Sequence, residues 1–582
     1  MKYAKLTYAE SGSEFEDGLF GINMEITRKG YFGGLSAQML NNRKLFSGSD
    51  CPAGWQMSGF EYIKDRPELS LCRSNFVLLK DGRMSQTSNV IETAKEVRYT
   101  AKLWVKALTD STVAFGLAGC EQVFNVSAVN EKYTELSFEF VGDDVKNGCF
   151  SVTVKGRIYV FEASLMPSDD FYGMRRDVIE ALRELAPSSV RIPGGCAADH
   201  FDWKDTLQAP EFRKPAPAGD KWFLFPDTYD QDCMDIGINE LLLLCKELGA
   251  EPEYTVSMIL SDGEDAARLV EYCNGSADTE FGAKRQALGL GPCGIRIWYI
   301  GNEAYFFGGK YRDDPLLAAR QTCELIRSMK AADGSIEPVI GLTWGADYRS
   351  WSRTFAEALD CEYEYVSYHN YIGILPDQTQ GENGMATPEM VEQLFRDGKD
   401  IGLEFYKNGL YKDGFGRIKV CADEWNYSWG RNSSNVLFLS NALQFHFFAK
   451  NGAKYHVRRA EFFTPVNEGM ITVDGRRVTI ESSGKMFRLM RGHCGGKIIR
   501  IDADPSLDVL CTKHGDKLFV SAANRCSEPE EFMIEGYRML SGTQIETDGF
   551  SFKCNSFRVY ETAEPVVKGH SVLFMWLEPA EQ

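Results

Sequence analysis

The chain has 582 residues, of which 44% are hydrophobic and 25% are charged, and its formal net charge is −19. One hydrophobic core rarely serves so long a chain, since domains mostly span about 100 to 200 residues, so we expect several domains. The negative charge, without a dense Lys/Arg block to offset it, argues against nucleic acid and anionic membranes as partners.

The N-terminal stretch and the cysteines indicate the compartment. The opening "MKYAKLTYAESGSEF" has no apolar segment typical of a secretory signal, and no window reaches the roughly 20 apolar residues that a membrane span needs. The 16 cysteines show no C-x-x-C spacing, and the seven histidines stand at no zinc-ligand interval. We therefore expect a cytoplasmic protein with mostly free thiols, no metal and no cofactor.

The first third of the chain reads mainly as strands. "KYAKLTYAE" is strand-like, and "GLFGINMEI", residues 18 to 26, has the apolar character of a buried strand. Residues 51 to about 168 then hold short alternating stretches such as "VRYTAKLWVKAL" and "TELSFEFVG", with no convincing helix. This pattern predicts an inserted antiparallel β-sandwich.

From about residue 173 helical and strand-like segments alternate. "GMRRDVIEALRELA" precedes "SSVRIPGG", and the alternation continues to "RIKVCADEWN" and "RRAEFFTPVN". We count seven strands, and residues 18 to 26 supply an eighth. Serial alternation of this length favours a (β/α)8 barrel over an open sheet. After about residue 497 the sequence is again all-β.

The predicted fold class is therefore multi-domain α/β, a (β/α)8 TIM barrel with an inserted β-sandwich and a C-terminal β-sandwich. The expected parts are an N-terminal strand (1–14) that joins the C-terminal sandwich, the first part of the barrel (15–50), the inserted sandwich (51–168), the remainder of the catalytic barrel (169–496) and the C-terminal sandwich (497–582).

Two carboxylates stand where predicted barrel strands end, which is where such barrels carry their active sites. Glu303 and Glu424 follow strongly apolar strands, the fourth and the seventh, which face each other across a barrel. Either residue alone is more often a rim residue or an ion-pair partner. Together they provide what retaining glycoside hydrolysis needs, one acid and one nucleophile about 5 to 5.5 Å apart. We predict that both are catalytic.

Other polar and aromatic residues accompany this pair. The amide of Asn302 can bind a sugar hydroxyl, and His369 and Tyr371 are expected to orient Glu424. Aromatic side chains, among them Trp298 and Trp425, suit the C–H faces of sugar rings.

Several motifs occur together in one order along the chain. They are "GLFGINMEITRKGYFGGLSAQMLNNRKLF", "VRIPGGCAADHFDWKD", "LVEYCNGSADTEFGAKRQALG", "WYIGNE", "VSYHNYIG" and "CADEWN". With these motifs, the chain resembles glycoside hydrolase family 51, the α-L-arabinofuranosidases, from about residue 15 to about residue 500. The inserted sandwich resembles the carbohydrate-binding-like module of one branch of that family.

The resemblance implies roles for individual residues. Glu303 matches the general acid/base and Glu424 matches the nucleophile. The residues expected to bind the substrate are Glu25, Arg191, Cys196, Asn302, His369, Tyr371 and Trp425. Cys196 stands where many members have Asn, and Thr464 aligns with a position that is Gln in some members, so the sugar specificity is less firmly implied than the mechanism.

The resemblance also implies an activity, that of a retaining, exo-acting α-L-arabinofuranosidase that acts on a carbohydrate substrate, with homo-oligomers common. Two alternatives stay open: a retaining β-xylosidase or β-glucanase of the same clan, and a non-catalytic glycan-binding protein. The G-x-G-x-x-G match at Gly289, Gly291 and Gly294 precedes a strand and contains Pro292, so it does not predict dinucleotide binding.

Overall fold

The structure is a computed structural model. It describes residues 3–7, 13–26, 29–46, 50–128, 131–217, 231–306, 308–343, 349–371, 418–428 and 433–580. Within these ranges, no helix combines the length and the apolar character that crossing a membrane requires.

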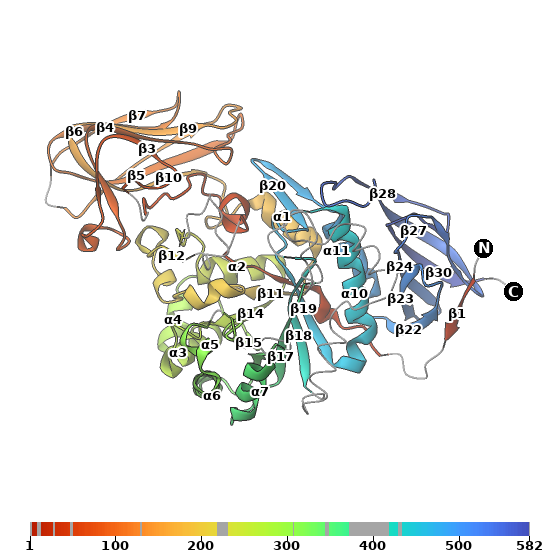
Figure 1. Ribbon diagram of the computed structural model, residues 1–582. Coiled ribbons are helices and arrows are strands. Elements are labelled where there is room, and N and C mark those ends of the chain that lie inside the picture. The colour runs from red at the N-terminus through yellow and green to blue at the C-terminus, as the bar shows by residue number, and fades with distance from the viewer. Residues whose placement is uncertain are drawn as a thin grey trace.

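Eight parallel strands close into a barrel at the centre of the molecule (Figure 1). In chain order they are β2 (Gly21–Asn23), β11 (Ser189–Ile192), β14 (Glu251–Val256), β15 (Ile297–Ile300), β16 (Glu337–Gly341), β17 (Tyr365–Tyr371), β18 (Lys419–Asn426) and β19 (Val457–Phe463). The barrel closes where β2 pairs with both β11 and β19. The predicted fold class is confirmed, including the first barrel strand within residues 18 to 26.

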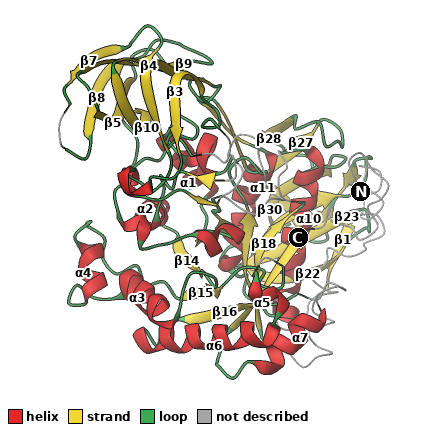
Figure 2. Ribbon diagram, turned by 60° about the vertical axis from the view of Figure 1, so that its left-hand side comes forward, coloured by secondary structure: helices red, strands yellow, loops and turns green. Residues whose placement is uncertain are grey.

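Helices surround the barrel strands, as Figure 2 shows. They are α1 (Arg176–Leu185), α2 (Ile238–Leu248), α3 (Gly263–Asn274), α4 (Glu280–Gln286), α5 (Lys310–Asp313), α6 (Pro315–Ala332), α7 (Arg349–Ala358), α10 (Asn435–Tyr455) and α11 (Ser482–Met490). The local sequence explains where these helices begin. In α6 the carboxylate of Asp314 caps the first turn and Pro315 takes the first helical position, a combination that stabilises a helix start by about 1 kcal/mol.

Helix α10 is buried almost all round because it lies between two sheets. It packs on β18 and β19 of the barrel on one side and on β23 (Leu507–His514) on the other. The sequence of α10 is accordingly apolar on most faces, as expected for a helix without a solvent side.

The inserted segment forms a sheet in the order β7-β6-β9-β4-β10-β5-β8, with β3 also paired to β4. Its strands are β3 (Gln56–Ile63), β4 (Phe76–Thr87), β5 (Arg98–Ala107), β6 (Ser111–Leu117), β7 (Gln122–Val126), β8 (Thr134–Val141), β9 (Cys149–Lys155) and β10 (Arg157–Pro167). The sheet curls on itself, so that strands near opposite ends of the order meet. The ring of Phe138 on β8 lies 5.2 Å from that of Phe115 on β6. The two layers enclose their own hydrophobic core.

The C-terminal sheet lies on the far side of the barrel from the insert (Figure 1). Its order is β26-β1-β22-β23-β24-β30-β27-β28. The bounds are β1 (Tyr3–Thr7), β22 (Lys497–Asp502), β23, β24 (Lys517–Asn524), β26 (Met533–Ile534), β27 (Tyr537–Thr547), β28 (Phe557–Glu561) and β30 (Val572–Pro579). The first strand pairs antiparallel with β22, which ties the two ends of the chain into one sheet. We propose that the domains have the boundaries predicted from the sequence.

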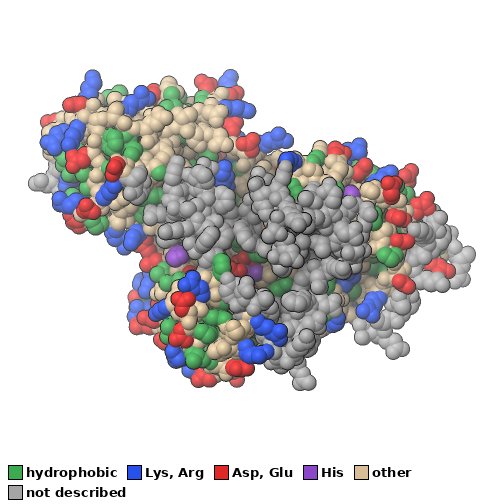
Figure 3. Space-filling view, viewed as in Figure 1, with side chains coloured by type: hydrophobic (Ala, Val, Ile, Leu, Met, Phe, Trp, Pro, Cys, Tyr) green, Lys and Arg blue, Asp and Glu red, His purple; other side chains and the backbone are tan. Residues whose placement is uncertain are grey.

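Shorter pairs complete the strands. They are β12 (Ala216–Pro217) with β13 (Gln231–Asp232), β20 (Ile471–Asp474) with β21 (Arg477–Ile480), and β25 (Glu530–Glu531) with β29 (Val566–Val567). A disulfide joins Cys323 of α6 to Cys361, and the other 14 cysteines, all of them in the described ranges, form no disulfide there. On the face in Figure 3, acidic and basic side chains are interspersed over the insert and the barrel.

Candidate active site

The predicted site residues come from the carboxyl ends of five barrel strands, the first of which, β2, is followed by Glu25. Arg191 lies on β11, Glu303 follows β15, and His369 and Glu424 lie on β17 and β18. The register of the sheet pairs His369 with Glu424 directly. The barrel therefore brings together side chains that are more than 230 residues apart in the sequence.

Glu303 occupies a left-handed backbone conformation, with a φ of 44° two residues after Gly301, whose φ is 70°. For a residue other than glycine, a sparsely populated backbone conformation costs about 1 to 3 kcal/mol and is found mostly at functional sites. Glu303 comes shortly after the last paired residue of β15, and its partly exposed carboxylate points toward the barrel mouth. Glu303 is thus held in a position that its local sequence does not favour.

Glu424 is 4% exposed, and each of its two oxygens receives a donor. The hydroxyl of Tyr371 donates to Oε2 at 2.7 Å, and Nη1 of Arg191 donates to Oε1 at 3.2 Å. Burial raises the pKa of Glu424, as does Glu303, and these effects outweigh the opposing influence of His369 and Arg191. The two donors fix the direction of the carboxylate.

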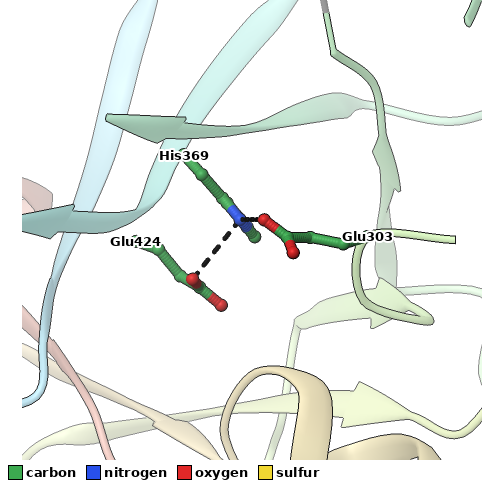
Figure 4. Close-up of side chains that lie close together, drawn as sticks. All are labelled: Glu303, His369 and Glu424. Atoms are coloured by element: carbon green, nitrogen blue, oxygen red, sulfur yellow. Dashed lines mark hydrogen bonds and ion pairs between the residues drawn. The ribbon is translucent and has the colours of Figure 1, made fainter. Parts of the chain in front are cut away.

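His369 lies between the two predicted catalytic residues (Figure 4). Its Nδ1 is 2.5 Å from Oε1 of Glu303 and 3.4 Å from Oε2 of Glu424. Burial lowers the pKa of the imidazole, but Glu424, Glu303 and Asp423 together raise it well above its usual value. His369 is therefore an imidazolium that bridges two carboxylates.

The two carboxylates are close together. One oxygen of Glu303, one of Glu424 and a ring nitrogen of His369 all lie within 4.8 Å of one another. Among the described residues this is the group of His, Cys, Asp and Glu side chains that is compact enough to hold a metal ion. Nδ1 of His369 itself contacts both carboxylates, at 2.5 Å and 3.4 Å.

The orientation of the Asn302 amide is set by two neighbours. Nη2 of Arg191 donates to its Oδ1 at 2.7 Å, so the amide nitrogen points the other way, where it donates to Sγ of Cys196 at 3.4 Å. Burial raises the pKa of the Cys196 thiol well above its usual value, so this residue is a neutral thiol. The Asn302 amide thus presents N–H groups to the site.

Two consecutive glycines allow the loop after β11 to approach the site closely. A Cβ on Gly194 would collide with the backbone of Glu25, and one on Gly195 would collide with the carboxylate of Glu424. The chain beyond them donates from the amide of Ala197 to Oε1 of Glu25 at 2.8 Å. The carboxylates of Glu25 and Glu424 therefore both lie beside Gly195.

Trp425 does not lie in the site, and the prediction that its side chain binds substrate is wrong. It is fully buried and packs on Phe445 and Phe448 of α10, with ring centroids 6.3 and 5.6 Å away. Neighbouring residues of a strand point to opposite faces, so once Glu424 faces the barrel mouth Trp425 must face the helices. Trp298 is likewise fully buried, against Tyr254 on the helix side.

Ser367, which the sequence analysis did not single out, supports the site. Ser367 lies two residues before His369 on the same face of β17, and it donates to Asp423 at 2.6 Å. The period of two in Ser367, His369 and Tyr371 is a signal that sequence reasoning could have used. Thr464 is buried and its hydroxyl donates to the carbonyl of Val466 at 3.3 Å.

Comparison with known proteins agrees with the family resemblance found in the sequence. A family model described as "Alpha-L-arabinofuranosidase 1 domain" matches residues 181–372. The resemblance to glycoside hydrolase family 51 is confirmed. An intracellular exo-α-(1→5)-L-arabinofuranosidase of Acetivibrio thermocellus is 28% identical over 288 residues, which are 46% of this chain and 52% of that protein. The probable α-L-arabinofuranosidase C of Aspergillus terreus is 33% identical over 280 residues, 45% of this chain and 52% of that protein.

Solved structures of family 51 enzymes share the fold. An arabinose-bound family 51 α-L-arabinofuranosidase superposes over 100% of both chains with a TM-score of 0.76 at 16% identity. The arabinose complex of the Thermotoga maritima α-L-arabinofuranosidase covers 70% of this chain and 91% of that chain, with a TM-score of 0.58 at 20% identity. The chain spans about half the length of the two curated relatives from Acetivibrio thermocellus and Aspergillus terreus.

Proposed function

We propose that this chain is a retaining, exo-acting α-L-arabinofuranosidase that releases arabinose from arabinose-substituted polysaccharides or oligosaccharides. The observation that carries the proposal is the short separation of Glu303 and Glu424, since one oxygen of each lies within 4.8 Å of the other. Retaining glycosidases hold their two carboxyl groups about 5 to 5.5 Å apart, whereas inverting enzymes need about 6.5 to 9.5 Å to admit a water molecule. The short separation favours double displacement.

In the first step Glu303 protonates the glycosidic oxygen while Glu424 attacks the anomeric carbon. The leaving group departs as an alcohol, and arabinose becomes an ester of Glu424. Because Tyr371 and Arg191 each donate to one oxygen of Glu424, the attacking carboxylate is held in one direction before the substrate arrives.

In the second step Glu303, now ionised, removes a proton from a water molecule that attacks the anomeric carbon from the side that the leaving group vacated. The bond to Glu424 breaks, and arabinose leaves with its original configuration. Nδ1 of His369 lies 2.5 Å from Oε1 of Glu303, so His369 is placed to hold this carboxyl group in position in both steps.

Asn302, Glu25 and Cys196 are proposed to surround the sugar. The amide of Asn302 turns its N–H groups toward the site, which suits a bond to the hydroxyl beside the anomeric carbon. Such bonds strengthen as positive charge grows on the ring in the transition state. Glu25 is one of two carboxylates beside Gly195, so it is placed to accept from a sugar hydroxyl.

The cell compartment and the assembly are part of the proposal. Two relatives, from Acetivibrio thermocellus and Halalkalibacterium halodurans, are named intracellular exo-α-(1→5)-L-arabinofuranosidases, which supports a cytoplasmic enzyme. A carbohydrate is the expected partner, with neither nucleic acid nor a membrane involved. A homo-oligomer is expected from the resemblance, and light scattering of the purified chain measures it.

The test compares wild type, Glu424→Gly and Glu303→Ala on 4-nitrophenyl α-L-arabinofuranoside, with the β-xyloside and β-glucoside beside it. Wild type is expected to prefer the arabinofuranoside. Glu424→Gly is expected to lose turnover, and azide should rescue it to give the azide of inverted configuration. Glu303→Ala with azide should give the azide of retained configuration.

Three outcomes contradict the proposal. A Glu424→Gly variant that keeps full turnover would exclude Glu424 as nucleophile, and a wild type that hydrolyses only the xyloside or glucoside would change the sugar. A folded wild-type chain without turnover on any of the three substrates would favour a glycan-binding protein.

A further inference from the structure

Asp423, the residue before the proposed nucleophile, is a buried carboxylate in the wall of the site. Its side chain is 0% exposed, and it lies on β18 among residues of neighbouring strands. A buried charge is costly unless hydrogen bonds and opposite charges compensate it. The contacts of its two oxygens show what compensates it.

One oxygen of Asp423 is anchored by neutral donors of β17. The hydroxyl of Ser367 donates to Oδ1 at 2.6 Å, and the backbone amide of Tyr368 donates to the same oxygen at 3.1 Å. The amide of Asn23 on β2 also holds the backbone carbonyl of Asp423, at 3.2 Å. The carboxylate is therefore fixed by groups that have no part in the chemistry.

The other oxygen faces two cations. Oδ2 of Asp423 lies 3.3 Å from Nη2 of Arg191 and 3.5 Å from Nε2 of His369. These are the same two side chains that contact the proposed catalytic pair, since Arg191 donates to Glu424 and His369 contacts Glu303. Asp423 touches neither catalytic carboxylate through a hydrogen bond that the structure describes, but it touches both of their cationic partners.

The charges around Asp423 come from every strand packed against it. Arg191 on β11 and His369 on β17 are the positive groups, and Glu424 on β18 and Glu461 on β19 are acidic. Burial raises the pKa of Asp423, but Arg191 and His369 lower it more, so its pKa lies below the usual value and the residue is ionised.

We propose that Asp423 is a positioning residue of the reaction, which holds Arg191 against the nucleophile Glu424 and His369 against the acid/base Glu303 through one carboxylate. This inference rests on the proposed function for the roles of the two glutamates. Loss of the one negative charge of Asp423 would remove a contact from Arg191 and from His369 at the same time. Outer-shell partners of this kind typically cost about 10- to 100-fold when they are removed from metal sites, and we expect a similar loss here.

The variant that tests the proposal is Asp423→Asn, which keeps the shape and lets the amide oxygen accept from Ser367 and Tyr368. Its amide nitrogen would then face Arg191 and His369 with a donor, so neither cation keeps its contact. A decrease in kcat/KM of about 10- to 100-fold is expected. The alkaline limb of the kcat/KM profile should move to lower pH, because the imidazolium of His369 loses one of the three carboxylates that keep it protonated.

Asp508→Asn is a matched control. Asp508 is also a buried carboxylate that pairs with a histidine and with cations, namely His446 at 2.8 Å, Lys450 at 2.5 Å and Arg525. It lies on β23, outside the active site. Asp508→Asn should lower the melting temperature and leave the pH profile in place, which is the behaviour of a purely structural carboxylate.

The two variants and wild type are measured on whichever aryl glycoside wild type hydrolyses, so failure of the arabinofuranosidase assignment does not affect this test. A displaced pH profile in Asp423→Asn but not in Asp508→Asn supports the inference. If Asp423→Asn keeps its kcat/KM within about threefold, or only melts earlier with an unchanged profile, the positioning role is refuted. Should Asp423→Asn not fold, Ser367→Ala, which removes only the anchor of Oδ1, is expected to show a smaller shift in the same direction, and an unchanged profile there overturns the inference.

Discussion

Nδ1 of His369 lies 2.5 Å from Oε1 of Glu303, closer than any contact His369 makes with Glu424. The sequence led us to expect that His369 and Tyr371 both orient Glu424, and only Tyr371 does so through a short hydrogen bond. The closer partner of His369 is Glu303. Each carboxylate of the proposed pair therefore has its own orienting residue, and both of these residues come from β17.

Replacing His369 should weaken acid catalysis more than nucleophilic attack. In His369→Gln the carboxyl group of Glu303 loses the side chain that orients it, whereas Glu424 keeps Tyr371 and Arg191. We expect kcat/KM to fall by about 100-fold on a phenyl glycoside, whose leaving group needs protonation, and by much less on a 2,4-dinitrophenyl glycoside. Equal losses on both substrates would contradict this division of roles.

A matched control for that variant is His493→Gln. His493 is fully buried, and its two ring nitrogens bond to Thr512 and Ser521 of the C-terminal sheet. It is expected to change the melting temperature and to leave the ratio of rates on the two substrates as in wild type.

Gly195→Ala should disturb the nucleophile directly. The added methyl group would collide with the carboxylate of Glu424, whose Tyr371 and Arg191 contacts leave it little freedom to move. A displacement of about 1 Å at a reacting group can cost about 100-fold in rate, and we expect kcat to fall accordingly. Gly341→Ala on β16 is the control, because a Cβ there meets no atom within 4 Å. Full activity in Gly195→Ala would contradict this geometry.

Trp425→Phe tests the corrected position of Trp425. Since its indole packs between the barrel and α10, the smaller ring should destabilise the fold by about 0.5 to 3 kcal/mol, the usual range for such changes. KM should stay within about twofold of wild type, because the side chain does not reach the sugar. A large increase in KM with unchanged melting would show that the indole contacts substrate.

Acid should weaken the junction between α10 and the C-terminal sheet. His446 and His493 both bond to the hydroxyl of Ser521, at 2.8 Å each. Burial lowers the pKa of His446, and it lowers that of His493 well below the usual value. Because the folded state resists protonation, the stability is fully present above about pH 6.5 and decreases as the pH falls toward the folded pKa values.

The measurement is the melting temperature between pH 8 and pH 5. In wild type it should decrease as the pH falls below about 6.5, and in His493→Gln, which cannot titrate, the decrease should be smaller. A wild-type melting temperature that is constant over this range would contradict the prediction.

Glu461 should lower the stability of the fold at high pH, whereas the two histidines lower it at low pH. It is fully buried, neither of its oxygens has a hydrogen-bond partner among the described residues, and burial together with Glu253 and Asp423 raises its pKa well above the usual value. A raised folded pKa favours the folded state at low pH, and that benefit is lost as the pH rises through the folded pKa. Glu461→Gln should therefore raise the melting temperature more at pH 8.5 than at pH 6. A uniform decrease at both pH values would show that the carboxylate is ionised and stabilising.

The sequence by itself determined the strands and the residues at their ends. The eight barrel strands are short apolar runs between helical segments, and this local periodicity survives in the fold because parallel strands are buried on both faces. Glu303, Glu424 and Asn302 were identifiable because polar groups at the end of such runs are costly unless they are used.

The tertiary structure decided which side chains meet. The face on which Trp425 points depends on how β18 is placed against α10, and a local pattern does not contain that placement. The pairing of His369 with Glu303 depends on the register of β17 and on the left-handed backbone of Glu303. The contacts of Asp423 join β11, β17 and β18, and only closure of the barrel brings those strands together, since ion pairs form between residues that are neighbours in space and not in sequence.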